Sequence, residues 1–166
     1  MDHLDDMVPT RVLLVDDDIQ PLELRAEVLR MNGFSVISAP GGVEAMAIMA
    51  ASPEGIDVAV LDYQMPIMNG GVLAKRLRSL CPDVKIILHS GAVDIPCCAM
   101  TSVDAFIPKG DGMATLIGQI VAFVRPGVPT RCSTGEDPGC LQPTASGTER
   151  ISCSYQSMIA RSAAER

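Results

Sequence analysis

Five short apolar segments alternate with segments of helical periodicity between Arg11 and Val124, and this alternation limits the folds open to the chain. Residues 12–15 are continuously apolar and residues 56–61 nearly so, which is typical of strands buried on both faces of a sheet. The predicted strands are residues 12–15, 34–38, 56–61, 84–89 and 105–107. Strands that alternate with helices predict an α/β fold, in which a five-stranded parallel sheet is flanked by five helices.

Capping and helix-breaking residues mark the ends of the predicted helices. Asp18 is a candidate N-cap for the first helix, and an Asn-Gly pair at 32–33 is a stop signal. Further helices are expected at 41–51, from about 70 to 80, and at 111–124, and a short or irregular helix is expected at 94–101. The first and third helices have predicted apolar faces, formed by Leu24, Val28 and Met31, and by Leu73, Leu77 and Leu80.

Polar side chains follow four of the predicted strands. In a parallel sheet the carboxyl ends of the strands share one edge, where functional groups gather. We therefore expect five residues that are distant in sequence to meet at this edge: Asp16, Asp17, Asp62, Ser90 and Lys109.

The chemistry of these groups fits a phosphoryl group. Three close carboxylates repel one another unless a cation lies among them, and ligands that are all oxygen suit Mg²⁺. Lys109 supplies a compensating positive charge, and Ser90 supplies a hydroxyl that can donate to an anion. A carboxylate is also able to attack phosphorus and form an acyl phosphate.

Four motifs resemble the receiver domain of two-component response regulators. They are Val-Asp-Asp-Asp at 15–18, Leu-Asp-Tyr-Gln-Met-Pro at 61–66 with Asn-Gly at 69–70, Leu-His-Ser-Gly at 88–91, and Phe-Ile-Pro-Lys-Gly at 106–110. The resemblance covers roughly residues 10–125. It implies a doubly wound, flavodoxin-like receiver fold.

The resemblance also implies a role for each motif residue. Asp62 would be the phospho-acceptor, Lys109 would pair with it and then with the phosphoryl group, and Ser90 would contact that group. Ser90 and Phe106 would be the switch residues. The implied Mg²⁺ ligands are Asp16 (directly or through water), Asp17, Asp62 and the backbone carbonyl of Gln64.

The sequence departs from the family pattern near its last motif. Phe106 replaces the commoner Tyr, so the ring has no hydroxyl. Gly110 follows Lys109 where the family usually has Pro, and Gly relaxes the backbone that Pro would fix. The segment from Ser90 to Lys109 is shorter than usual. Strand alternation directs His89 away from the face of Ser90, so we expect a packed histidine rather than a catalytic one.

Charge and hydropathy limit the partners and the location. The formal net charge is −7 and the surplus of acids lies within residues 1–125, which argues against nucleic acid as a partner. No apolar run is long enough to span a membrane, and residues 1–9 lack the order of a signal peptide. We therefore expect a cytoplasmic protein that has no membrane contact.

The chain divides into three parts by composition. Residues 1–9 form an N-terminal extension, residues 10–125 form the receiver domain, and residues 126–166 form a tail of low order that is rich in Pro, Gly, Ser and Thr. The tail is too polar for a DNA-binding output domain. Output is therefore expected through contact with another protein, and the formation of a homodimer is left open.

The sequence is compatible with three functions. The first is a phospho-switch, loaded by a sensor histidine kinase or a phosphotransfer protein, whose only catalysis is its own phosphorylation and dephosphorylation at Asp62. The second is a pseudo-receiver that binds a partner and rarely accepts phosphoryl groups. The third is an aspartyl-phosphate phosphatase of the haloacid dehalogenase type. Asp16-Asp17-Asp18 contains its Asp-x-Asp, but the Gly and Thr that usually follow are absent.

Overall fold

The computed structural model describes residues 9–52, 55–92 and 95–124. Five parallel strands form one sheet in the order β2-β1-β3-β4-β5. Their bounds are β1 Arg11–Val15, β2 Ser35–Ala39, β3 Val58–Leu61, β4 Lys85–Ser90 and β5 Ala105–Pro108. The predicted fold class is confirmed, and each strand lies within two residues of its predicted bounds.

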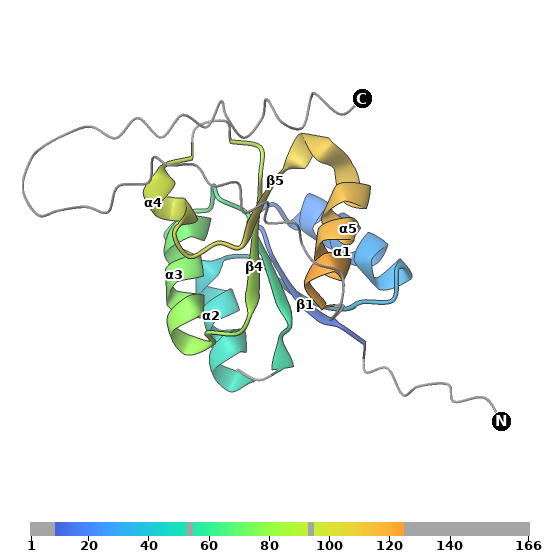
Figure 1. The fold of residues 1–166 in the computed structure, drawn as a ribbon, viewed down its shortest axis with the longest axis horizontal. Helices are drawn as coiled ribbons and strands as arrows, with labels where there is room; N and C mark the ends of the chain where they lie inside the picture. Colours follow the sequence, from blue (N-terminus) through green and yellow to red (C-terminus); the bar gives the residue numbers. More distant parts are fainter. Residues whose placement is uncertain (1–8, 53–54, 93–94, 125–166) are drawn as a thin grey trace, which may run out of the picture. The chain divides into compact units, whose positions relative to one another are not determined.

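The helices cover both faces of this sheet (Figure 1). Helices α2, α3 and α4 lie on one face, and α1 and α5 lie on the other. Their bounds are α1 Ile19–Met31, α2 Gly42–Ala51, α3 Gly70–Leu80, α4 Cys97–Met100 and α5 Gly112–Val124, with a 3₁₀ turn, η2, at Lys109–Asp111. In the described part of the segment expected to be a short or irregular helix, the helix consists of the four residues of α4.

Strand alternation divides the apolar core into two clusters. On β1, Leu13 and Val15 join the cluster beneath α2 and α3, whereas Val12 and Leu14 join the cluster beneath α1 and α5. All four side chains are almost fully buried. A strand buried on both faces must be apolar at every position, which explains the continuous apolar run in the sequence.

The predicted apolar face of α1 is wrong. Leu24 and Met31 are 69% and 79% exposed, while the side chains buried against the sheet are Leu22, Ala26 and Leu29. Leu80, predicted on the apolar face of α3, is also exposed because it is the last residue of that helix.

Asp62 is positioned by a close approach of helix α3 to the end of β3. A Cβ on Gly70 would lie 2.2 Å from the carbonyl oxygen of Asp62, so only glycine fits there. Asn69 caps the helix by accepting a hydrogen bond from the Val72 N–H at 3.0 Å. The turn after Asp62 is thereby fixed against the first turn of α3.

Several sequence predictions fall outside the described residues. These are the N-terminal extension through residue 8 and the tail at 126–166. Among the helices that the structure describes, none has the length and apolar character required to cross a membrane.

Candidate functional site

Three carboxylates meet at the carboxyl edge of the sheet, as predicted. Asp16 and Asp17 follow β1, and Asp62 follows the neighbouring β3, whose register pairs Val15 with Leu61. One carboxylate oxygen from each of the three aspartates lies within 4.8 Å of the others. Asp16 and Asp62 are buried and Asp17 is exposed, so the cluster has a closed side and an open side.

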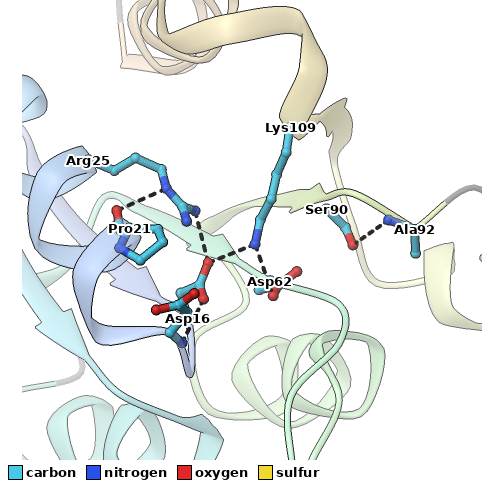
Figure 2. Close-up of polar contacts among 8 residues, drawn as sticks. Asp16, Pro21, Arg25, Asp62, Ser90, Ala92 and Lys109 are labelled. Atoms are coloured by element: carbon cyan, nitrogen blue, oxygen red, sulfur yellow. Dashed lines mark hydrogen bonds and ion pairs between the residues drawn. The ribbon is translucent and has the colours of Figure 1, made fainter.

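Lys109 reaches this cluster from the end of β5 (Figure 2). Its Nζ lies 2.8 Å from Oδ2 of Asp16 and 3.0 Å from Oδ2 of Asp62. The side chain is 30% exposed, so it crosses from the surface to the buried acids. The presence of Gly110 after Lys109 therefore does not prevent the lysine from pairing with the predicted acceptor.

Arg25 is a second cation at the cluster and was not predicted from the sequence. From the middle of α1, its NH1 group donates to Oδ2 of Asp16 at 2.9 Å, and its Nε donates to the carbonyl of Pro21 at 3.1 Å. The signal in the sequence is a basic residue beside Leu22 and Ala26, on the buried face of the helix. Arg25 was not recognised as a buried residue because the predicted apolar face of the helix was Leu24, Val28 and Met31.

The carboxylate of Asp16 is held by donors on both oxygens. Its Oδ1 accepts from the Asp18 N–H at 3.0 Å, and its Oδ2 accepts from Arg25 and Lys109. Burial alone would raise the pKa of Asp16, but the Lys109 hydrogen bond, the Asp18 N–H and the positive charges of Arg25 and Lys109 hold it below the ordinary value of 3.8. Asp16 is therefore ionised in the folded protein at neutral pH.

The remaining predicted site residues are Ser90, Gln64 and Phe106. Ser90 ends β4, is buried, and accepts a hydrogen bond on Oγ from the Ala92 N–H at 3.2 Å. Gln64 is exposed, two residues after Asp62. Phe106 is half-buried on β5 and packs against the core cluster beneath α2 and α3.

His89 is packed in the core, as strand alternation predicted. Its side chain is 4% exposed, and neither ring nitrogen has a hydrogen-bond partner. Burial, together with the positive charges of Arg25 and Lys109, lowers the pKa of His89 to about 4. The ring is therefore neutral at physiological pH.

The donor set of the cluster fits a hard divalent cation. The carboxylates of Asp16, Asp17 and Asp62 offer oxygen ligands at mutual distances that one small ion can bridge. The Lys109 ammonium contacts both Asp16 and Asp62 and could neutralise an anion bound at Asp62. A cation site beside a carboxylate can support phosphoryl transfer, which depends on positioning and charge neutralisation.

Comparison with solved structures gives the same fold. The response regulator TrrA of Thermotoga maritima, in complex with Mg(2+)-BeF, is 26% identical, with a TM-score of 0.63 over 69% of this chain and 99% of that one. The complex of histidine kinase ThkA with TrrA contains a chain that is similar at 26% identity and TM-score 0.63, over 70% of this chain and 99% of that one.

Curated relatives include a protein named a response regulator and one named a transcriptional regulatory protein. MprA of Mycobacterium sp. (strain KMS) is 33% identical over 135 residues, which are 79% of this chain and 55% of the relative. PrrA of Mycobacterium tuberculosis, 32% identical over 129 residues (76% of this chain, 54% of the relative), is named a transcriptional regulatory protein. The chain spans about half the length of both relatives. The family described as the response regulator receiver domain matches residues 12–120. This chain therefore belongs to the receiver domain family of two-component response regulators.

Proposed function

We propose that this receiver accepts a phosphoryl group on Asp62 in a Mg²⁺-dependent reaction. The observation that carries the proposal is the position of the Asp62 carboxylate, with two further acids on one side and the Lys109 ammonium 3.0 Å away. Receiver domains are signalling modules rather than enzymes that act on external substrates. Because receiver domains are signalling modules, a phospho-switch is also favoured over a phosphatase of the haloacid dehalogenase type.

The transfer step needs a nucleophile and charge neutralisation. An oxygen of Asp62 would attack phosphorus while the bond from phosphorus to the donor's imidazole nitrogen breaks, and the electron pair stays on that nitrogen. Lys109 would then follow the negative charge from the carboxylate to the phosphoryl oxygens. Ser90 would exchange its hydrogen bond from Ala92 for a contact with the phosphoryl group.

The metal ligands are proposed to be Asp17, Asp62 and the backbone carbonyl of Gln64, with Asp16 acting directly or through water. When bound, Mg²⁺ would neutralise charge on the phosphoryl oxygens. Asp16 and Asp17 thus serve to hold the cation beside the acceptor. The crystal structure of TrrA with Mg(2+)-BeF supports this assignment by similarity.

The phosphoryl donor is proposed to be a sensor histidine kinase or a phosphotransfer protein. The complex of ThkA with TrrA supports the class of partner. We propose that residues 10–125 form the receiver, that phosphorylation shifts Ser90 and Phe106, and that the shifted surface contacts another protein in the cytoplasm. The net charge of −7 favours a protein over nucleic acid as the direct partner of this chain.

Intact mass spectrometry tests the proposal directly. The chain is incubated with acetyl phosphate and Mg²⁺, beside an Asp62→Asn variant and a sample with EDTA. One phosphoryl adduct is expected, and it should require both Asp62 and the metal. An adduct that survives in the Asp62→Asn variant would show that another residue is the acceptor.

The pseudo-receiver is the second candidate, and the four-residue helix α4 favours it. If so short a helix cannot change its packing, phosphorylation would have little output. This candidate predicts a folded protein that takes up no phosphoryl group from acetyl phosphate. Circular dichroism of the same sample establishes whether the protein is folded.

A further inference from the structure

Arg25 connects helix α1 to the acid cluster, although it lies nine residues after Asp16 (Figure 2). Its side chain is 13% exposed, whereas that of Arg30, on the same helix, is 42% exposed. The hydrogen bond from Nε to the Pro21 carbonyl fixes the plane of the guanidinium, and NH1 then points at Asp16. A charged side chain buried this far and bonded at two points is fixed in its position.

Arg25 and Lys109 share one oxygen of Asp16. Both cations contact Oδ2, at 2.9 and 2.8 Å, and the Asp18 N–H occupies Oδ1. Lys109 also contacts Asp62, so its ammonium can pair with either carboxylate. The contacts of Arg25 described here are to Asp16 and Pro21 alone, so its charge stays with Asp16.

This arrangement changes the charge that an incoming ion meets. Three carboxylates are offset by two cations at the cluster, and the loss of Arg25 would leave them offset by one. The affinity of an oxygen-ligand site for a divalent cation rises with its negative charge. Arg25 therefore opposes the binding of a bare cation and favours any state in which the site also holds an anion.

We propose that Arg25 is a positioning residue that keeps Mg²⁺ binding weak in the unphosphorylated receiver and strengthens binding of the phosphoryl group. Arg25 holds the Asp16 carboxylate in place and adds a fixed positive charge to the site. The inference rests on the proposed function, because it concerns the same metal and the same acceptor. As a consequence, bound Mg²⁺ and a bound phosphoryl group should each increase the affinity of the site for the other by a larger factor than they would without Arg25.

Two titrations test this inference with opposite expected signs. Isothermal titration calorimetry with Mg²⁺ alone should give an affinity roughly tenfold tighter for Arg25→Gln than for the unaltered chain, because a repelling charge is lost. Titration with beryllofluoride at saturating Mg²⁺ should give an affinity at least about threefold weaker for Arg25→Gln, because an attracting charge is lost. General damage to the site would weaken both.

Matched variants separate charge from structure. Arg30→Gln removes the same charge from the exposed end of the same helix, where Arg30 pairs with Glu23 and Glu27, and should leave both affinities unchanged. Arg25→Lys keeps the charge and should stay within about threefold of the unaltered chain for Mg²⁺. If Arg25→Gln does not fold, Arg25→Met keeps the aliphatic stem and should give the same signs.

Three outcomes would overturn the inference. Mg²⁺ affinity that is unchanged or weaker in a folded neutral variant contradicts the proposed role of Arg25 and leaves the proposed function standing. An equal shift in Arg30→Gln would make the effect one of overall charge. If the unaltered chain, shown to be folded, bound no Mg²⁺, the proposed function and this inference would fail together.

Discussion

Replacing His89 with leucine should abolish the contribution of this residue to the loss of stability between pH 6.5 and pH 4. His89 is buried without a hydrogen-bond partner for either nitrogen, and its pKa falls from 6.5 to about 4 on folding. As the pH falls below 6.5, the unfolded chain takes up a proton on this residue and the folded chain does not. Stability therefore falls through this range and loses nothing further from His89 below pH 4.

The magnitude follows from the two pKa values. At pH 4.5 the preferential protonation of the unfolded state costs about 2.5 kcal/mol in the free energy of unfolding. At pH 7.5 both states are neutral at this residue, and the cost vanishes. His89→Leu replaces an unpartnered polar ring with an apolar side chain of similar size, so at pH 7.5 it should change stability by less than about 1 kcal/mol.

Urea unfolding, followed by circular dichroism, measures the difference. Both proteins are unfolded in EDTA at several pH values from 4 to 8, and the free energies are subtracted so that contributions of the carboxylates cancel. The variant should gain about 2.5 kcal/mol relative to the unaltered chain at pH 4.5. Parallel curves, or an NMR titration in which His89 protonates near 6.5, would refute the account of its burial.

Three further predictions concern a strained loop residue, a hydrogen-bond network and the site lysine. Ile67 is 95% exposed at a φ of 67°, a region that β-branched residues disfavour, so Ile67→Asn should stabilise the fold by about 1 kcal/mol in urea unfolding; a loss would contradict this. The Arg78 guanidinium donates to three backbone carbonyls and one carboxylate. Arg78→Ala should therefore cost about 2 kcal/mol, whereas the exposed Arg76→Ala should cost little; equal costs would count against the network. Lys109→Ala should still bind Mg²⁺ in calorimetry but lose the NMR shifts that phosphorylation causes, and complete loss of Mg²⁺ binding would refute the role given to Lys109.

The sheet and the acid cluster could be predicted because both follow from position along the chain. A parallel strand that is buried on both faces must be apolar. The first acidic residue after the apolar run therefore marks the end of the strand in the sequence, as Asp16 and Asp62 do. Once the strands are placed, the topology brings these ends to one edge without any knowledge of side-chain contacts. The meeting of Asp16, Asp17, Asp62 and Lys109 needed no other information.

The face of α1 could not be predicted in the same way. The buried set Leu22, Ala26 and Leu29 and the predicted set Leu24, Val28 and Met31 have identical spacing, although Leu24 and Met31 are exposed and Val28 is half-buried. Periodicity identifies both stripes but does not show which one faces the sheet, and the predicted set contains the bulkier residues. The connection from β1 decides which stripe meets the sheet. The error also concealed Arg25, whose position looks solvent-exposed if the wrong stripe is buried.

The identity of the phospho-acceptor is the central claim, and chemical trapping tests it at a single residue. The chain is treated with acetyl phosphate and Mg²⁺ and then with sodium borohydride, which reduces an aspartyl phosphate to homoserine, and the digested peptides are sequenced by mass spectrometry. The account predicts homoserine at the position of Asp62 and at no other acid of the cluster. Trapping at Asp16 or Asp17, or no trapping in protein shown to be folded, would contradict it.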